Sequence, residues 1–322
     1  MKAIRYHEFG GPDVLQLDEI AKPEPGPNEV LVKVAAIGVN FSEIGRRAGK
    51  FPLMPGQSLP MTPGYECAGV VEHVGSGVPP TSFKPGDRVL ARAIANTYAE
   101  YVAAPAASLY QIPPTLSFND AATLSGAFTT AWAAVVLAGK VQKGETVLVQ
   151  AAASGVAIAV VQLAKHAGAT VIGTASSDEK LAWAKQYGLD HGINYVTHDF
   201  MAEAKGLTGG KGVDVIIDGV GGDVFLKGLK TLRVGGRMVV YGVAGGKRTA
   251  EVTLPELWFN SLTIVGASSG TTSREAFQQM IHMVADGRLK ATVDRAWPLA
   301  RAAEAHRYIE DRKVRGKVVL TP

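Results

Sequence analysis

The sequence predicts an α/β fold that joins a mostly antiparallel β domain to a parallel, doubly wound sheet. Of the 17 prolines in the 322 residues, 14 precede residue 120. Proline suits loops, turns and edge strands because it has no N–H for a strand ladder. From residue 146 onward, short apolar strands alternate with helical segments, which is typical of a parallel sheet covered by helices. We therefore expect a β domain at 1–120 plus 271–322, and a doubly wound domain at 121–270.

The β domain is indicated by short β-type runs between turn signals. Proline and glycine stand together at 25–27, 63–64 and 85–86, and such pairs mark turns. The runs lie at 30–35, 68–74, 87–91 and 98–102. Short runs separated by turns favour an irregular, mostly antiparallel sheet.

The doubly wound domain is indicated by six short apolar strands with helical segments between most of them. The predicted strands are 146–150, 170–174, 192–195, 213–218, 237–241 and 262–266, and the predicted helices are 155–167, 178–187 and roughly 223–232. This alternation matches a complete dinucleotide-binding domain. A helix at 274–286 then leads to a short apolar ending at 317–321, which we expect to return to the β domain.

Composition excludes several classes of protein. The net charge of +4 comes without a run of Lys or Arg, whereas nucleic-acid binding needs a clustered basic patch. The longest near-apolar run, 151–164, is too short to span a membrane. A single cysteine excludes an internal disulfide framework, and the N-terminal residues have no apolar segment of the signal-peptide kind. We expect a cytoplasmic protein.

The most informative stretch is 146–165, which reads TVLVQAAASGVAIAVVQLAK. It has the form of a strand, a tight turn and a helix, an arrangement that holds a pyrophosphate on backbone N–H groups and a helix N-terminus. The usual G-x-G-x-x-G is absent, but the turn is built almost entirely from small residues. The candidate contacts are Ala153, Ser154, Gly155 and Val156. A turn that binds nothing is the alternative.

The end of the second strand favours NADP over NAD. An NAD site usually places an acidic residue here for the ribose 2′-hydroxyl, whereas this chain reads GTASSDEK at 173–180. Thr174 and Ser176 are candidate contacts, and Lys180 would neutralise a 2′-phosphate. Ser176 and Glu179 form a capping box that would aim a helix N-terminus the same way. The alternative is that Lys180 is a solvated helix lysine.

Small-residue loops follow the fourth, fifth and sixth strands, at 218–222, 241–246 and 266–270. Ligands of open α/β sheets bind at the carboxyl ends of the strands, and such loops leave room for a flat cofactor. The candidate contacts are Gly219, Val220, Tyr241, Gly242, Val243, Ala267 and Ser268. Glycine turns without a ligand are the alternative.

No metal site or covalent nucleophile is indicated. The seven histidines form no ligand pair at helical or turn spacing, and zinc needs several Cys, His or carboxylate ligands close together. Cys67 lies in an apolar run and is interpreted as a small core residue. Arg46 and Arg47 are interpreted as a solvated pair.

Several short segments, taken together and in this order, are characteristic of one enzyme family. They are IGVNF at 37–41, PGYECAGVV at 63–71, KPGDRV at 84–89, TAW at 130–132, the turn after 150, INY at 193–195 and GKVVL at 316–320. With these segments the whole chain resembles the zinc-independent quinone oxidoreductases of the medium-chain dehydrogenase/reductase superfamily. The resemblance implies a GroES-like β domain beside a Rossmann domain, an active site in the cleft between them, and hydride transfer from NADPH.

The resemblance also implies roles for single residues. Asn40 and Thr130 would lie near the nicotinamide. Lys180 and Tyr195 would hold the 2′-phosphate or the adenine ribose, and Lys317 would be a late contact. A homodimer, joined through the edge of the sixth strand, is implied as well.

The chain departs from the family pattern at two places. Related turns commonly read A-A-x-G-G-V-G, whereas Ser154 and Ala157 replace two glycines here, which bears on pyrophosphate affinity. A tyrosine often found shortly after the asparagine is absent, and Gly45 stands at its approximate position. No role of that tyrosine is carried over.

We expect a zinc-independent enzyme that transfers a hydride from NADPH to a quinone. Metal-dependent relatives carry a cysteine at the position of Asn40 and a histidine at that of Tyr65. Without a metal, a quinone or enone is easier to reduce than a simple ketone, because conjugation spreads the incoming charge. Asn40 is the candidate for orienting the acceptor's oxygen. Tyr65 is a weaker candidate, with a packed tyrosine as its alternative.

Two other functions stay open. One is the NADPH-dependent reduction of α,β-unsaturated carbonyls, such as enones, alkenals or enoyl thioesters. The other is a low-turnover NADPH-binding protein with a sensing or structural role. In each case the expected partner is a small molecule or a second copy of the chain, and neither nucleic acid nor a membrane is expected.

Overall fold

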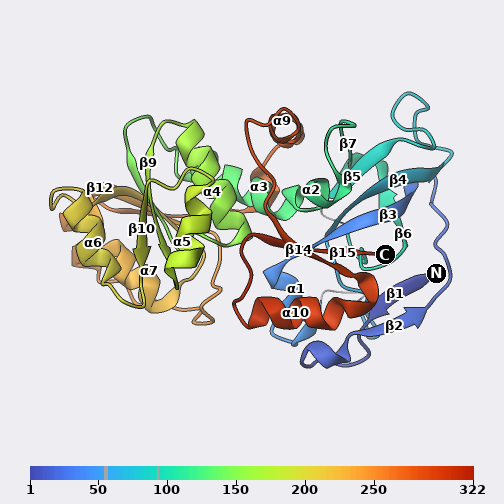
Figure 1. The fold of residues 1–322 in the computed structure, drawn as a ribbon, viewed down its shortest axis with the longest axis horizontal. Helices are drawn as coiled ribbons and strands as arrows, with labels where there is room; N and C mark the ends of the chain where they lie inside the picture. Colours follow the sequence, from blue (N-terminus) through green and yellow to red (C-terminus); the bar gives the residue numbers. More distant parts are fainter. Residues whose placement is uncertain (54–56, 93) are drawn as a thin grey trace. The chain divides into compact units, whose positions relative to one another are not determined.

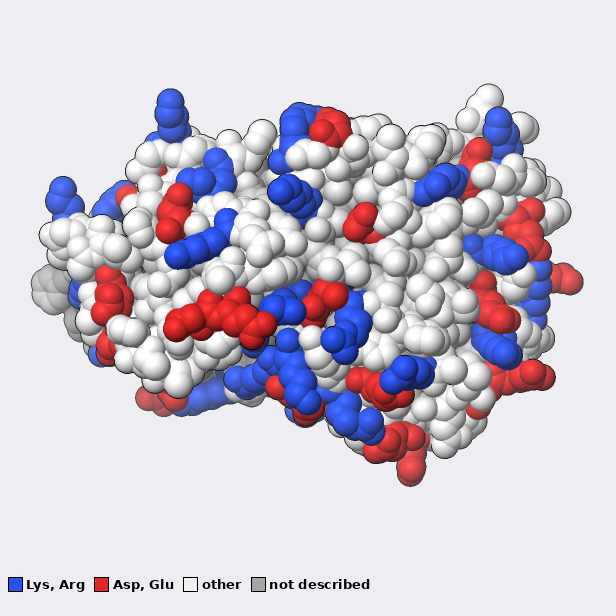
Figure 2. All heavy atoms as spheres, in the orientation of Figure 1, with Lys and Arg blue, Asp and Glu red and all other residues white. Residues whose placement is uncertain are grey.

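The computed structural model describes residues 1–53, 57–92 and 94–322. It contains two compact units, shown in Figure 1. The N-terminal unit comprises Met1–Gly126 and Gln278–Pro322, and the central unit comprises Ala127–Phe277. On the face shown in Figure 2, Lys and Arg side chains are interspersed with Asp and Glu, in keeping with the small net charge.

The N-terminal unit is built on a mostly antiparallel sheet with the order β14-β15-β3-β4-β5-β7, and β6 also pairs with β3. A two-stranded sheet, β1-β2, accompanies it. The strands are β1 (Lys2–Arg5), β2 (Gln16–Glu19), β3 (Glu29–Val39), β4 (Glu66–Val74), β5 (Arg88–Arg92), β6 (Tyr101–Pro105), β7 (Leu109–Gln111), β14 (Val293–Pro298) and β15 (Lys317–Thr321). Its helices are α1 (Phe41–Arg47), α2 (Phe118–Ala122) and α10 (Ala302–Glu310).

The pairing of β15 with β3 positions the polar groups of this unit. The two strands are antiparallel, with Val318 opposite Val39. All three strands β15, β3 and β4 carry buried apolar side chains, which fixes the register because a slip by one residue would turn them to the other face. The register brings Lys317, just before Val318, level with Asn40, just after Val39.

The central unit is a parallel, doubly wound sheet, as the alternation of strands and helices predicts. Its order is β10-β9-β8-β11-β12-β13, and every neighbouring pair is parallel. The strands are β8 (Thr146–Val149), β9 (Thr170–Ala175), β10 (His191–Asn194), β11 (Val213–Asp218), β12 (Leu232–Val240) and β13 (Thr263–Gly266). The chain reverses direction across the sheet between β8 and β11, which is where open sheets of this kind bind ligands.

The helices of the central unit are α4 (Gly155–His166), α5 (Asp178–Lys185), α6 (Phe200–Leu207), α7 (Gly222–Leu229) and α8 (Leu254–Phe259); α3 (Leu124–Trp132) and α9 (Arg274–Ala285) cross its boundaries. A π-helical segment, Ala133–Ala138, continues α3. Buried apolar residues line α4 along nearly its whole length. No helix in the described part of the chain is long and apolar enough to cross a membrane.

The structure corrects three expectations about element boundaries. The helix expected at 223–232 ends at Leu229, because Leu232 already begins β12. The strand expected at 98–102 begins only at Tyr101, because Ala99 is bridged to Ala3 instead. The residue that caps α5 is Ser177 and not Ser176: the Ser177 hydroxyl accepts a hydrogen bond from the Lys180 N–H at 3.3 Å.

Candidate functional site

The residues predicted for the site divide between the two units. Asn40, Tyr65 and Lys317 belong to the N-terminal unit, and the other candidates belong to the central unit. We describe each set within its own unit.

The turn after β8 is held by the neighbouring strand β9. The Thr174 hydroxyl donates to Gln150 Oε1 at 2.6 Å and accepts from the Ala151 N–H at 3.2 Å. The Ala152 N–H donates to the Thr174 carbonyl at 2.7 Å. Ala151 has φ +51°, a left-handed conformation that usually favours glycine. The hydrogen bonds of Thr174 therefore hold the tight turn, which in related sequences is made by glycines.

The N-terminus of α4, at the end of this turn, has no side-chain cap. Ser154 stands at the N-cap position, but its hydroxyl bonds to Tyr241 and caps nothing. The first N–H groups of α4 are thus left for another acceptor, and such a terminus suits an anion. Beside it, the amide nitrogen Nε2 of Gln150 is buried without a partner in the described part of the chain. Both features fit the pyrophosphate of a dinucleotide.

Tyr241 fills the space over Gly219. A Cβ atom at Gly219 would lie 2.3 Å from Tyr241 Cζ, so only glycine fits beneath the ring. Burial raises the pKa of the Tyr241 hydroxyl, which stays neutral and able to donate. Asp218, next to Gly219, is buried and accepts the N–H groups of Val220 at 2.7 Å and Gly221 at 3.2 Å. The loop after β11 is thereby fixed by its own aspartate.

The ends of β9 and β10 lie side by side and carry the residues predicted for the 2′-phosphate. The Tyr195 N–H donates to the Ala175 carbonyl at 3.1 Å, and the Tyr195 side chain is 45% exposed. Ser176 follows Ala175, and Lys180 lies in the first turn of α5. No acidic side chain occupies the position of Ser176.

Most of the remaining candidates of the central unit lie at other places along the same edge of the sheet, and Thr130 lies on a helix. Ala267 and Ser268 follow β13, and the Ala267 N–H donates to the Val240 carbonyl at 2.9 Å. Gly242 and Val243 follow β12, and Val243 is partly exposed. Thr130 lies on α3 and is partly exposed.

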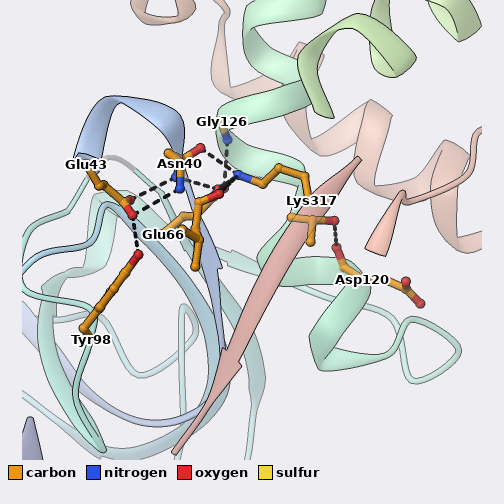
Figure 3. Close-up of polar contacts among 9 residues, drawn as sticks. Asn40, Glu43, Glu66, Tyr98, Asp120, Gly126 and Lys317 are labelled. Carbon is orange, nitrogen blue, oxygen red and sulfur yellow. Dashed lines mark hydrogen bonds and ion pairs between the residues drawn. The ribbon is translucent and has the colours of Figure 1, made fainter. Parts of the chain in front are cut away.

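In the N-terminal unit, Asn40 stands at the centre of a buried polar cluster (Figure 3). Its amide nitrogen donates to Glu43 Oε1 at 3.1 Å and to Glu66 Oε1 at 2.9 Å. Its amide oxygen accepts from Lys317 Nζ at 2.7 Å. Lys317 Nζ also bonds to Glu66 Oε1 at 2.9 Å, and the Gly126 N–H donates to Glu66 Oε2 at 2.8 Å.

These partners fix which way the Asn40 amide points. An ammonium can only donate and a carboxylate only accepts, so Oδ1 must face Lys317 and Nδ2 must face the two glutamates. Both N–H groups of Nδ2 are then used, and one lone pair of Oδ1 is left. Toward a ligand Asn40 is an acceptor, whereas orienting an acceptor's oxygen would need a free N–H. The sequence gives a signal for this cluster in an acid and a lysine within otherwise apolar strands, at Glu66 and Lys317.

A second chain of hydrogen bonds joins Glu43 to α10. Tyr98 donates to Glu43 Oε2 at 2.6 Å and lies 3.0 Å from His306 Nε2. His306 Nδ1 lies 3.2 Å from Arg47 Nη1, and Arg47 Nη2 donates to Glu310 Oε1 at 2.6 Å. Because an arginine only donates, Nδ1 accepts, and Nε2 carries the ring's hydrogen.

On the sequence alone, Arg46 and Arg47 are interpreted as a solvated pair. For Arg47 this prediction is wrong. Arg47 is 1% exposed, and its guanidinium also donates to the Gly10 carbonyl at 3.2 Å. An amphipathic helix of only seven residues turns adjacent side chains to different sides, so Arg47 enters the core while Arg46 faces elsewhere. Its partners are distant in the sequence, and no local pattern reveals them.

Burial determines the protonation states of Glu43 and His306 in this series of hydrogen bonds. Desolvation raises the pKa of Glu43 to about 7, although the hydrogen bonds from Tyr98 and Asn40 and the charge of Lys317 oppose the rise. Desolvation lowers the pKa of His306 to about 3, and the positive charge of Arg47 acts in the same direction. His306 is thus neutral at physiological pH, and Glu43 is close to its own titration point.

The donor set does not fit zinc. The described residues contain no group of three or more His, Cys, Asp or Glu side chains that could hold a metal ion. Cys67 is buried in the core, as predicted, and burial raises the pKa of its thiol to about 12. Glu66 is already engaged by Lys317 and Asn40.

The pKa of His306 predicts a dependence of stability on pH. In the unfolded chain this histidine has a pKa near 6.5, so between pH 6.5 and about 3 the unfolded state binds a proton that the folded state does not. The contribution of His306 to stability is present above pH 6.5 and is lost as the pH falls. The raised pKa of Glu43 acts oppositely, adding stability as the pH falls from about 7 towards 4.5.

A comparison of wild type with His306→Gln isolates the histidine, because Glu43 is present in both. The difference between their free energies of unfolding should shrink as the pH falls from 7 to 5, by at most about 1.4 kcal/mol per pH unit. Urea unfolding at several pH values measures it. His73→Gln, which alters an exposed histidine of β4, is the control. A difference for His306→Gln that stays constant with pH would contradict the neutral, buried histidine.

Comparison with known proteins gives a consistent family assignment. A model of the alcohol dehydrogenase GroES-like domain matches residues 26–114, and a model of the zinc-binding dehydrogenase family matches residues 155–286. The quinone oxidoreductase of Rattus norvegicus is 36% identical over 327 residues, which cover 99% of this chain and 97% of that protein. The 2-haloacrylate reductase of a Burkholderia species is 37% identical over 334 residues, covering 98% and 97%.

A solved structure of Escherichia coli quinone oxidoreductase complexed with NADPH matches with a TM-score of 0.91 and 33% identity, over 100% of both chains. The GroES-like domain, the doubly wound sheet and these full-length relatives agree. The chain is therefore an oxidoreductase that belongs to the quinone oxidoreductase family of the medium-chain dehydrogenase/reductase superfamily.

Proposed function

We propose that the protein reduces a quinone with NADPH. When bound, NADPH supplies a hydride to the acceptor, which also takes up one proton from water, so that a hydroquinone and NADP⁺ leave. The observation that carries the proposal is the uncapped N-terminus of α4 beside the unpartnered Gln150 amide, at the carboxyl end of β8. The relatives named quinone oxidoreductase, one of them complexed with NADPH, support it.

The cofactor is assigned to the carboxyl edge of the central sheet. Backbone N–H groups at Ser154 to Val156 and the Gln150 amide would bind the pyrophosphate, with the Tyr241 hydroxyl as a further donor. Lys180 and Tyr195 would bind the 2′-phosphate, since no acidic side chain stands at Ser176 to repel it. The wider set consists of Ala153, Thr130, Thr174, Gly219, Val220, Gly242, Val243, Ala267 and Ser268.

Asn40 is assigned to the nicotinamide. Its remaining Oδ1 lone pair suits an N–H donor, and the carboxamide of nicotinamide offers one. Lys317 and Glu66 would act by holding the Asn40 amide in this orientation, so we assign Lys317 as a positioning residue. The acceptor's oxygen would then be oriented by another group of the N-terminal unit, and Tyr65, whose neutral hydroxyl can donate, is the first candidate.

Two other functions are supported by specific observations. The 2-haloacrylate reductase relative favours reduction of a carbon–carbon double bond next to a carbonyl group. Ser154 and Ala157 in place of glycines favour a low-turnover NADPH-binding protein with a sensing or structural role. The single, buried cysteine suits a reducing compartment, and we place the reaction in the cytoplasm.

We also propose a homodimer formed at β13. This strand is the edge of the central sheet, and an unpaired edge readily adds another strand. Large apolar side chains are exposed on it and on the helix just before it: Leu254, Trp258, Phe259 and Ile264. Such a patch is typical of an interface.

The homodimer predicts a solution mass of twice that of the chain. Sedimentation equilibrium should show this mass for the wild type and a shift toward the monomer for Phe259→Glu. Val196→Glu, at an exposed position of the same unit outside the patch, should leave the dimer intact. A monomeric wild type at micromolar concentration would refute the proposal.

Lys180→Ala should weaken NADPH binding by about tenfold or more and change NADH binding less than about threefold, because a hydrogen bond to a charged group contributes about 1.5–3 kcal/mol. Lys185→Ala removes the same charge from the last turn of the same helix and should change neither affinity. Calorimetric titration of both nucleotides measures the effect. Equal losses for NADPH and NADH would exclude Lys180 from the 2′-phosphate site.

The proposed activity is tested by NADPH consumption with quinones, enones, alkenals and enoyl thioesters side by side. We expect the highest kcat/KM with a quinone. A clear preference for enones or alkenals would assign the protein to alkene reduction instead. Tight NADPH binding with no turnover of any acceptor would favour the binding-protein function.

A further inference from the structure

A hollow in the N-terminal unit lies directly against the Asn40 cluster. It encloses about 350 Å³ of empty space, part of it open to solvent, and Glu43, Arg46, Gln57 and Tyr65 are among its lining residues. Glu43 is the link, because the carboxylate that lines the hollow also accepts from Asn40. A molecule in this hollow would therefore be separated from Asn40, the residue that we assign to the nicotinamide, by the side chain of Glu43.

Arg46 is the cation of this hollow, and it is incompletely satisfied. Its Nη1 donates to Gln57 Oε1 at 3.1 Å, and its guanidinium carbon lies 5.7 Å from the centre of the Tyr65 ring. Its Nε is buried and has no hydrogen-bond partner in the described part of the chain. A buried donor left unpaired is costly, so this N–H calls for an acceptor.

Tyr65 accepts a hydrogen bond from the Arg46 guanidinium, but it is a neutral group, and Nε itself stays without a partner among the described residues. Glu43 is the one carboxylate among the described lining residues, and its two oxygens already receive hydrogen bonds from Asn40 and Tyr98. No ion pair joins Arg46 to an acidic side chain among the described residues. Tyr6 and Tyr65 keep neutral hydroxyls, because burial raises the pKa of each. Among the described residues, Arg46 thus has no carboxylate in direct contact, and its Nε hydrogen is left unpaired.

A carboxylate matches what Arg46 lacks. The planar guanidinium presents parallel N–H groups, and a carboxylate can accept two of them at once. Half-burial strengthens such a pair relative to one in water. A neutral carbonyl would satisfy the Nε hydrogen but leave the charge unpaired.

We propose that Arg46 selects acceptors that carry a carboxylate, which binds its Nε edge while the reducible group lies toward Asn40. The inference rests on the proposed NADPH-dependent reduction and deepens it by naming the class of acceptor. It makes Arg46 a specificity-determining residue, a role that the solvated pair inferred from the sequence would not have.

The test compares two acceptors that differ only in charge: trans-4-oxopent-2-enoate and its primary amide. Both hold the same enone, and the amide activates the double bond slightly more than the carboxylate does, so a preference for the acid reports binding and not intrinsic reactivity. For the wild type we expect kcat/KM to be at least about tenfold higher with the acid, because a charged hydrogen-bonded pair contributes about 1.5–3 kcal/mol. In Arg46→Met the KM of the acid should rise by about that factor, with the amide changed less than about threefold. Arg46→Lys should recover only part of the preference, since lysine keeps the charge but not the fork.

Arg301→Met is the matched control, because it removes an exposed arginine of the same unit and should alter neither acceptor. Equal kcat/KM for acid and amide in the wild type, or equal losses for both in Arg46→Met, would overturn the inference while leaving the reductase activity in place.

A binding measurement separates the inference from the proposed function. Calorimetric titration with 4-oxopentanoate and its amide needs no turnover. Tighter binding of the acid by the wild type, lost in Arg46→Met, supports the carboxylate site even if no acceptor is reduced. No difference between acid and amide overturns it, whatever the activity.

Discussion

The buried ammonium of Lys317 constrains the N-terminal unit more than any other group. A charge in the core must be paired and hydrogen-bonded, and removing one partner of such a pair typically costs about 3–5 kcal/mol. Lys317 is 7% exposed at its side chain and Glu66 is 1% exposed. The ammonium is fully used by Glu66, Asn40 and the Val39 carbonyl. Three segments distant in the sequence therefore have to meet at one atom.

This requirement explains why each polar group in the cluster has fixed hydrogen-bond partners. Lys317 reaches this cluster only if β15 pairs with β3 in the observed register. Glu66 also accepts a hydrogen bond from the Gly126 N–H, in the first turn of α3. Asn40, between them, has its amide orientation dictated from both sides. From Asn40 the hydrogen bonds continue through Glu43 and Tyr98 to His306 on α10. One set of polar contacts thus joins the end of the chain to the start of α1.

The general architecture was readable from the sequence because it rests on local signals. Alternating strands and helices predict the parallel sheet, and small residues after β8 predict a tight turn, since both depend on neighbours within a few positions. Capping was less certain, because Ser176 and Ser177 are adjacent and either could precede the helix. The helix predicted to end at 232 was too long, because an apolar residue such as Leu232 fits the end of a helix and the start of a strand equally well.

The polar partners were not readable, and for a physical reason. His306 contacts Arg47 and Tyr98, which lie 208 or more positions away from it in the sequence. Each of these residues alone resembles an ordinary surface or core residue. Nor does the sequence reveal that Gly219, interpreted as leaving room for a flat cofactor, also packs beneath the Tyr241 ring. Such choices are decided by packing between strands, which single-sequence patterns do not contain.

A side chain at position 219 can be accommodated only if the Tyr241 ring moves or is replaced. Any side chain at 219 would displace the aromatic ring, and a displaced ring would release the Ser154 hydroxyl from its bond to Tyr241. The freed serine could then turn back and cap α4 itself, as serines at this position commonly do. It would compete with an incoming phosphate for the same N–H groups. A substitution at 219 or 241, in the loops after β11 and β12, would thus change which groups are left free at the N-terminus of α4.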